Sequence, residues 1–179
     1  MLPVREYLEL LRDFFASGGY VLWVIFLVAL LLWTLIIERY AYLRLKYPRE
    51  LAQLVATWRR RADQSSWFAH QIRLALISDL SLRLTRSLAL IKSLIAICPL
   101  LGLLGTVTGM IHVFDVIAVL GTANARAMAN GISLATIPTM AGLVVALSGL
   151  FFSVRLGQQT ALEQQKAADL LREYREAPA

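Results

Sequence analysis

Residues 99–109 read Pro99-Leu-Leu-Gly-Leu-Leu-Gly-Thr-Val-Thr-Gly109 and lie inside a long stretch without charged side chains. Gly105 and Gly109 form a small-xxx-small pair, a spacing that lets helix backbones approach closely in a lipid bilayer. The hydroxyls of Thr106 and Thr108 need a hydrogen-bonding partner or water at that depth, because lipid tails provide neither. We therefore expect this helix to face other protein or a water-filled lumen rather than lipid.

The composition around this stretch is typical of a membrane protein. Of the 179 residues, 58% are hydrophobic and 17% are charged. Three runs contain no Asp, Glu, Lys or Arg: 14–37, 93–114 and 127–154. Each is longer than the roughly 20 residues that a helix needs to cross a bilayer. The sequence thus predicts an all-α membrane protein with transmembrane helices at 19–38, 94–115 and 131–154.

Lysine and arginine are concentrated on one side of these spans. The segment 39–93 carries eleven of them, whereas 116–130 carries only Arg126. Such residues mark the cytoplasmic side, so 39–93 and the tail 155–179 are predicted to be cytoplasmic and helical. The N-terminus, the loop of 116–130 and the start of the next helix lie outside, and residues 1–18 are predicted to form an amphipathic helix on the outer membrane surface.

The basic excess itself has two interpretations. Beside a membrane it sets the topology and favours contact with anionic lipids. Nucleic-acid binding is the alternative, but no recognition motif accompanies the charge, so no nucleic-acid partner is expected.

Helical periodicity continues beyond the membrane spans. Pro48 favours the start of a short helix, and the polar residues 63–66 favour a break after it. From Trp67 no proline or glycine interrupts the chain before the second span, so we expect one uninterrupted helix that continues into that span. The third span is expected to continue past Arg155 in the same way. The apolar stripes of these extensions need partners, which favours a homo-oligomer.

Two ionisable side chains, His112 and Asp115, lie three residues apart on one face near the outer end of the second span. Ionisable groups within a span are candidate functional residues. About 20 residues from Leu94 reach only Val113, so both side chains are expected near the outer membrane surface. Two interpretations stay open: a helix end wetted by solvent, or a site where protons are taken up from outside.

The third span carries a line of hydroxyl groups, Ser133, Thr136 and Thr139, but no acid or base. These hydroxyls could form interhelical hydrogen bonds in a small-residue packing interface. They could equally line a lumen that holds a file of water. The spacing leaves both interpretations open.

The sequence shows no sign of an enzyme. It contains no nucleophile elbow, phosphate loop, metal-ligand pair or dinucleotide fingerprint. The single cysteine, Cys98, gives neither a disulfide nor a metal site. We expect no catalytic residues, no metal and no cofactor.

The two polar spans together resemble a known family. Residues 99–111 are similar to the second-span signature of the MotA/TolQ/ExbB proton channel family, and residues 130–147 are similar to its third-span signature. The three-span topology resembles the ExbB and TolQ branches, ExbB most. This resemblance implies a homopentamer in the bacterial inner membrane with a periplasmic N-terminus, and protons as the coupling ion.

The resemblance also implies partners. Spans two and three would line a lumen that holds the single transmembrane helices of two ExbD- or TolR-like subunits, each with an essential Asp. Proton flow would drive this inner pair against the ring, and a TonB-like protein would carry the energy to outer-membrane transport. A TolQ-like role in a Tol–Pal envelope complex and a non-conducting scaffold for the partner are the alternatives. Membrane lipids are further expected partners.

The resemblance assigns roles residue by residue. Thr106 and Thr139 match the lumen threonines of spans two and three. The packing glycines of the family match Gly102, Gly105, Gly109, Gly131 and Gly142. Leu134 stands where ExbB and TolQ usually carry a glutamate in span three. We therefore expect the partner's Asp to be the only membrane acid on the proton path, solvated by Thr106, Thr139, Thr136 and Ser133.

Overall fold

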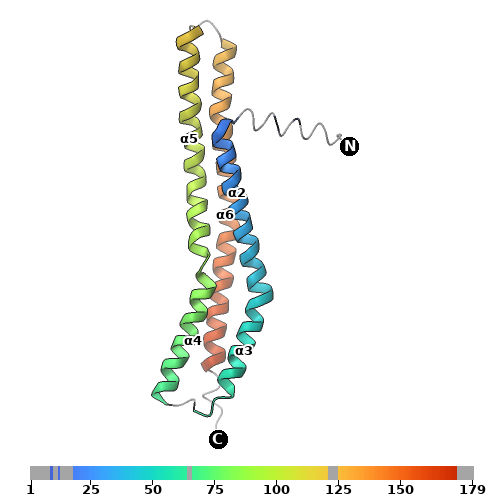
Figure 1. The fold of residues 1–179 in the computed structure, drawn as a ribbon, viewed down its shortest axis with the longest axis vertical. Helices are drawn as coiled ribbons and strands as arrows, with labels where there is room; N and C mark the ends of the chain where they lie inside the picture. The colour runs from blue at the N-terminus through green and yellow to red at the C-terminus, as the bar shows by residue number, and fades with distance from the viewer. Residues whose placement is uncertain (1–8, 10–11, 13–17, 64–65, 121–124, 173–179) are drawn as a thin grey trace. The chain divides into compact units, whose positions relative to one another are not determined.

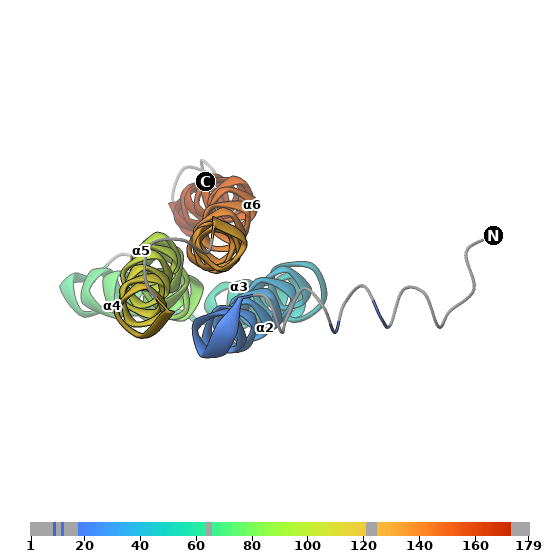
Figure 2. The same ribbon diagram turned by 90° about the horizontal axis from the view of Figure 1, so that it is seen from above.

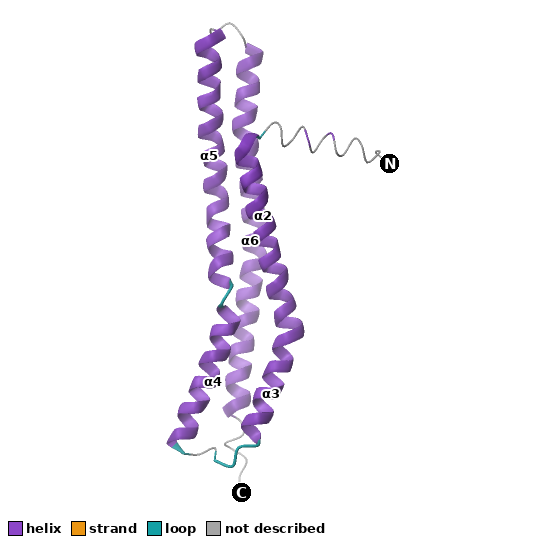
Figure 3. Ribbon diagram, viewed as in Figure 1, coloured by secondary structure: helices purple, strands orange, loops and turns teal. Residues whose placement is uncertain are grey.

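The computed structural model describes residues 18–63, 66–120 and 125–172, together with Glu9 and Arg12. Within these residues all regular structure is helical (Figure 3). In chain order the elements are α2 (Gly19–Ala41), the π-helical turn η1 (Tyr42–Lys46), α3 (Tyr47–Arg59), α4 (Trp67–Thr85), α5 (Leu88–Leu120) and α6 (Ala125–Arg172) (Figure 1). Most of the predicted amphipathic helix, the tip of the outer loop and the last residues of the tail lie outside the described residues.

Three helical stretches are long and apolar enough to cross a membrane. They are Gly19–Arg59, Trp67–Val119 and Gly131–Leu171. Each contains one of the three predicted spans. The prediction of an all-α chain with three helices able to span a membrane is therefore confirmed.

The chain divides into two compact units, described in turn. The first comprises Met1–Trp33 and Lys92–Leu150, and the second comprises Thr34–Ile91 and Phe151–Ala179. In the first unit, the beginning of α2 packs with α5 and the first half of α6, three helices that Figure 2 shows end-on. Its buried side chains include Leu22, Ile25, Leu32, Ile95, Cys98, Val113, Ala135 and Ala146. Large apolar side chains such as Val107 and Leu147 cover its outside, as expected for a surface that meets lipid or another protein.

In the second unit the helix that begins as α2 continues without a loop into α3. Pro48 lies in the first turn of α3, as predicted, but α3 follows α2 directly through η1. A proline has no N–H and its ring clashes with the carbonyl four residues earlier. The wider π turn accommodates this, and the Tyr47 N–H bonds to the Tyr42 carbonyl five residues back.

The break between α3 and α4 is confirmed. Ser66 has an extended backbone, with φ −70° and ψ 159°, and its side chain accepts a hydrogen bond from the Ala69 N–H at 3.2 Å. This is an N-cap, which satisfies a donor that the first helical turn leaves unpaired. Trp58 at the end of α3 then packs with Ala69 of α4 and Leu171 of α6 in the core of the second unit.

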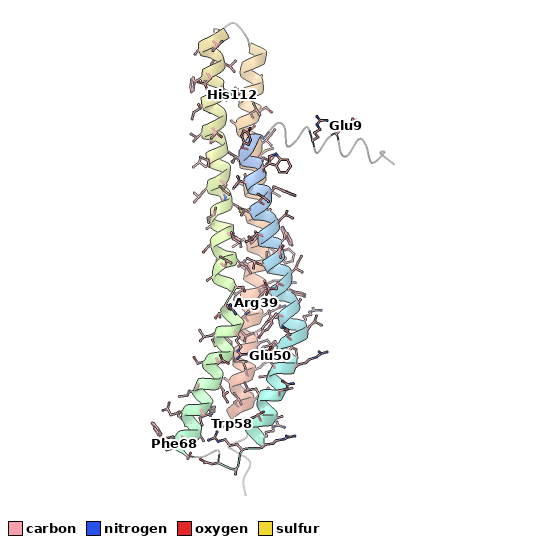
Figure 4. The ribbon with its side chains drawn as sticks, in the orientation of Figure 1. Glu9, Arg39, Glu50, Trp58, Phe68 and His112 are labelled. Carbon is pink, nitrogen blue, oxygen red and sulfur yellow. The ribbon has the colours of Figure 1, made fainter. Side chains whose placement is uncertain are left out.

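The prediction of one uninterrupted helix from Trp67 into the second span is wrong. Regular helical hydrogen bonding lapses at Arg86 and Ser87, between α4 and α5, although Arg86 keeps helical dihedral angles. The cause is a side chain from α2. The buried guanidinium of Arg39 donates to the Arg83 carbonyl, which would otherwise accept from the Ser87 N–H (Figure 4). Insertion of a side chain into the helical ladder is a known cause of kinks.

The third span does continue past Arg155, as predicted, because α6 is one helix of 48 residues. It runs through Pro138 without stopping. The absence of a side chain on Gly105 makes room for the proline ring on the facing helix. Pro138 has no N–H, so the Leu134 carbonyl lacks its usual bond from four residues ahead.

Candidate functional site

The contact between α5 and α6 in the first unit is built on glycines. A Cβ added to Gly109 would lie 2.6 Å from the Ala135 Cα, and one on Gly102 would lie 2.9 Å from the Thr139 Cα. A Cβ on Gly142 would lie 2.6 Å from the Cys98 carbonyl oxygen. Backbone atoms cannot give way as flexible side chains do, so these positions need glycine. We call this contact the glycine seam.

The other two predicted packing glycines lie in the same seam. A Cβ on Gly105 would collide with the ring of Pro138, and one on Gly131 would collide with Val113. The structure thus places all five glycines where α5 and α6 touch.

Thr139 and Thr106 both lie beside this seam. The Thr139 hydroxyl donates across the helices to the Gly102 carbonyl at 2.9 Å. Gly102 lies about one helical turn before Thr106, whose hydroxyl donates to the Leu103 carbonyl at 2.7 Å. Both threonines are half-buried at the edge of the seam.

Thr136 and Ser133 lie on the exposed side of α6. The Thr136 hydroxyl donates within its own helix to the carbonyls of Ile132 and Ser133, at 3.2 and 3.1 Å. An exposed hydroxyl at the middle of an apolar helix suits a wet or protein-covered surface better than lipid. Of the four predicted lumen residues, Thr106 and Thr139 therefore border the seam, whereas Thr136 and Ser133 lie on the exposed side of α6.

A separate cavity of about 380 Å³ lies where α2 meets α5 and α6. Residues 18–21 at the start of α2 form one wall. The side chains of Thr108 and His112 line it from α5, and Leu134 lines it from α6. Sequence reasoning linked neither His112 nor Thr108 with Leu134, because the wall from α2 is distant in sequence.

The α5 residues that line the cavity lie on a different side of the helix from Thr106, the predicted lumen residue of α5. At about 100° per residue, Thr108 lies roughly 200° around the helix from Thr106, and Asp115 roughly 180°. Asp115 and His112 are exposed. The structure therefore does not bring the predicted proton-uptake residues together with the threonines of the seam.

A network of polar contacts fixes the second unit. The Tyr42 hydroxyl donates to Glu50 Oε2 at 2.8 Å across the π turn, and the Arg39 guanidinium lies 4.9 Å from the centre of the Tyr42 ring. Burial first, and then the neighbouring Glu50, raises the pKa of Tyr42 above its ordinary value. The Tyr47 hydroxyl donates to the Glu163 carbonyl at 3.0 Å, and burial raises the pKa of Tyr47 to about 12.

Metal chemistry finds no support in the described part of the chain. No group of three or more His, Cys, Asp or Glu residues is placed there to hold a metal ion. The two histidines, His70 and His112, belong to different units.

Comparison with known proteins supports the resemblance of the two polar spans. The sequence model described as the MotA/TolQ/ExbB proton channel family matches residues 48–168. An ExbB-like biopolymer transport protein of Synechocystis sp. is 45% identical over 71 residues, 38% of this chain and 28% of that protein. The biopolymer transport protein ExbB of Helicobacter pylori is 38% identical over 74 residues, 41% of this chain and 51% of that protein.

A third relative is an ExbB homologue from Methanothermobacter thermautotrophicus, 42% identical over 64 residues, 36% of this chain. The matched segments span only 22% to 51% of the length of these three relatives. No solved structure matches the chain significantly.

Proposed function

The chain belongs to the MotA/TolQ/ExbB proton channel family, and from that premise we propose that it is the ExbB-like stator subunit of a proton-driven motor in the bacterial inner membrane. The observation that carries the proposal is the glycine seam bordered by Thr106 and Thr139. It brings two apolar helices to backbone contact and leaves hydroxyls along one edge. Around a ring of copies, such edges would line a common lumen.

A second protein supplies the acid in this proposal. Residues 131–154 contain no ionisable side chain, and Leu134 is apolar. A proton path along the threonines then needs a carboxyl group brought in by an ExbD- or TolR-like single-span subunit. Five copies around two such helices, with a TonB-like protein taking up the energy for outer-membrane transport, complete the assembly that we propose.

A non-conducting scaffold is the second candidate, and one observation favours it. The position of the family's usual glutamate is occupied by Leu134, so this subunit has no acid of its own in α6. A scaffold would hold the partner's helices in place without passing protons.

Proton flux in sealed vesicles separates these candidates. Vesicles carry the full chain with its co-expressed single-span partner, and a pH-sensitive dye reports proton movement under an imposed gradient. The motor predicts flux that depends on the partner's Asp and is reduced at least tenfold by Thr106→Val or Thr139→Val. Absence of flux under every load supports the scaffold.

The matched control is Thr57→Val in α3. Thr57 is exposed, and like the seam threonines it donates to a backbone carbonyl, that of Gln53 at 2.8 Å. It belongs to the second unit, whereas the seam belongs to the first. Flux that survives both seam substitutions would exclude the threonine path, and equal loss in all three variants would point to a general defect in folding.

A further inference from the structure

We infer that the cavity beside the start of α2 is a water-filled proton site, in which the His112 imidazole binds and releases protons from the periplasmic side. The direction of proton movement rests on the proposed function. The chemistry of the cavity does not, because it follows from the groups that line it.

The cavity is large enough to hold water, and its mostly apolar lining includes two polar residues of α5. These residues are His112 and Thr108, and the Thr108 hydroxyl donates to the carbonyls of Leu104 and Gly105 in its own helix. The Leu134 carbonyl, from a residue in the opposite wall, has no helical N–H partner because Pro138 follows four residues later. Ordered water commonly satisfies such freed carbonyls in membrane helices. A volume of about 380 Å³ can hold about twelve waters at roughly 30 Å³ each.

Histidine is the residue type that exchanges protons between about pH 5 and 8 in proteins. Among the described residues that line this cavity, the histidine is His112. The other ionisable groups nearby are few. Tyr20 on α2 is 93% exposed. Asp115 lies about one turn beyond His112 on α5 and is exposed. From α6, residues 131–154 contribute no ionisable side chain.

The glycine seam separates this cavity from the threonines. Gly105 against Pro138 and Gly109 against Ala135 leave no space for even one added carbon. A proton on His112 is therefore on the α2 side of a closed contact, whereas Thr106 and Thr139 border its other side. The cavity is a site of its own and not the end of the threonine line.

Cysteine labelling tests whether water fills the cavity. His112→Cys is made in the full chain, reconstituted in sealed vesicles with its outer face outside. A membrane-impermeant methanethiosulfonate is added from that side. We expect the new thiol to react at least tenfold faster than the native Cys98, which is fully buried.

Two neighbours serve as controls at the same depth. Val113 is 4% exposed and packs against Gly131, so Val113→Cys reports a buried position. Ile111 is 56% exposed, and its side chain points about 100° around α5 from that of His112. Ile111→Cys therefore reports the reactivity of an exposed position outside the cavity. If the thiol at position 112 reacts only with a lipid-soluble reagent, lipid fills the cavity and the inference is wrong.

Nuclear magnetic resonance tests the proton itself. The chain has two histidines, so labelled imidazoles give two sets of signals, and His70→Gln assigns them. The His112 signal is expected to change reversibly with the pH outside the vesicles. Leu134→Phe, which fills the cavity with a larger apolar side chain, is expected to slow its proton exchange at least tenfold. The inference is wrong if the His112 signal does not change with pH while the His70 signal does.

Proton flux then separates this inference from the proposed function. Flux that needs Thr106 but survives His112→Gln leaves the motor standing and removes the proton site. A His112 that titrates in a protein without flux under any load keeps the site and removes the motor. Restoration of lost flux in His112→Gln by Leu134→Glu would show that the cavity needs one titratable group in its wall and supports the site.

Discussion

The hydroxyl of Thr139 on α6 donates a hydrogen bond of 2.9 Å to the backbone carbonyl of Gly102 on α5. It is a side-chain bond between two helices that otherwise meet through glycines. It joins the packing of the seam to the polar line beside it, since the same residue serves both.

Thr139→Val should therefore lower stability as well as flux. Loss of one interhelical hydrogen bond in a membrane protein costs about 0.6 kcal/mol on average. Reversible unfolding in mixed micelles measures this cost. Thr139→Ser keeps the hydroxyl and should stay within experimental error of the parent, so equal losses in both variants would show that the methyl group and not the hydrogen bond stabilises the seam.

Gly142→Ala should destabilise the first unit by about 1 to 3 kcal/mol, the usual cost of overpacking. Its Cβ would lie 2.6 Å from the Cys98 carbonyl oxygen, and neither backbone can move without separating the helices. Gly157→Ala in the same helix is the matched control. Nothing lies within 4 Å of its added Cβ, so alanine there should stabilise α6 by about 0.5 to 1 kcal/mol. Thermal unfolding of both variants checks the opposite signs.

Tyr47→Phe should cost the second unit about 1 kcal/mol. Tyr47 is 2% exposed, and phenylalanine keeps its packing but loses the bond to the Glu163 carbonyl. Chemical unfolding followed by circular dichroism measures the difference. A variant as stable as the parent would mean that the hydroxyl contributes nothing to this core.

The same tyrosine gives the second unit a dependence on alkaline pH. Its pKa in the folded protein is about 12, above the ordinary value of 10, so the folded state favours the neutral phenol. The stability that this contributes is complete below pH 10 and is lost as the pH rises from 10 through about 12. Tyr47→Phe should remove this part of the alkaline loss, measured as the change in unfolding free energy between pH 9 and pH 11. An unchanged pH dependence in the variant would assign the loss to other groups.

Arg39→Met should straighten the junction of α4 and α5. Without the guanidinium, the Arg83 carbonyl is released to the Ser87 N–H, the bond of a continuous helix. Hydrogen exchange at the Ser87 amide should then slow at least tenfold. Arg44→Met is the control, because Arg44 is exposed and lies over the Tyr40 ring, 5.0 Å from its centre. Faster exchange at Ser87 in Arg39→Met would show that the arginine orders the junction instead of kinking it.

Most of the helices could be predicted from local signals. Charge-free runs locate the spans, Pro48 marks α3 and Ser66 caps α4, and each signal lies within a few residues of its effect. The kink at Arg86–Ser87 could not be predicted this way. Its cause, Arg39, is 44 residues from the carbonyl that it bonds.

In the candidate site too, some features could be predicted from local sequence spacing and others depend on residues distant in sequence. The glycines and threonines of the seam are visible as spacings along two helices. The cavity is not, because residues 18–21 of α2 complete it only after folding. Leu134 was visible as an unusual residue, but its place opposite His112 needed the three-helix arrangement.

The direction of the threonine hydrogen bonds has a consequence for any carboxylic acid that approaches the edge of the seam. Thr106, Thr136 and Thr139 each donate to a backbone carbonyl. A hydroxyl has one proton to donate, so these three offer a visiting group only their lone pairs. Lone pairs accept a bond from a carboxylic acid that keeps its proton, and they repel the oxygens of a carboxylate. At the edge of the seam, these hydroxyls can therefore accept a hydrogen bond from a neutral carboxylic acid, and in this arrangement they donate none to a carboxylate.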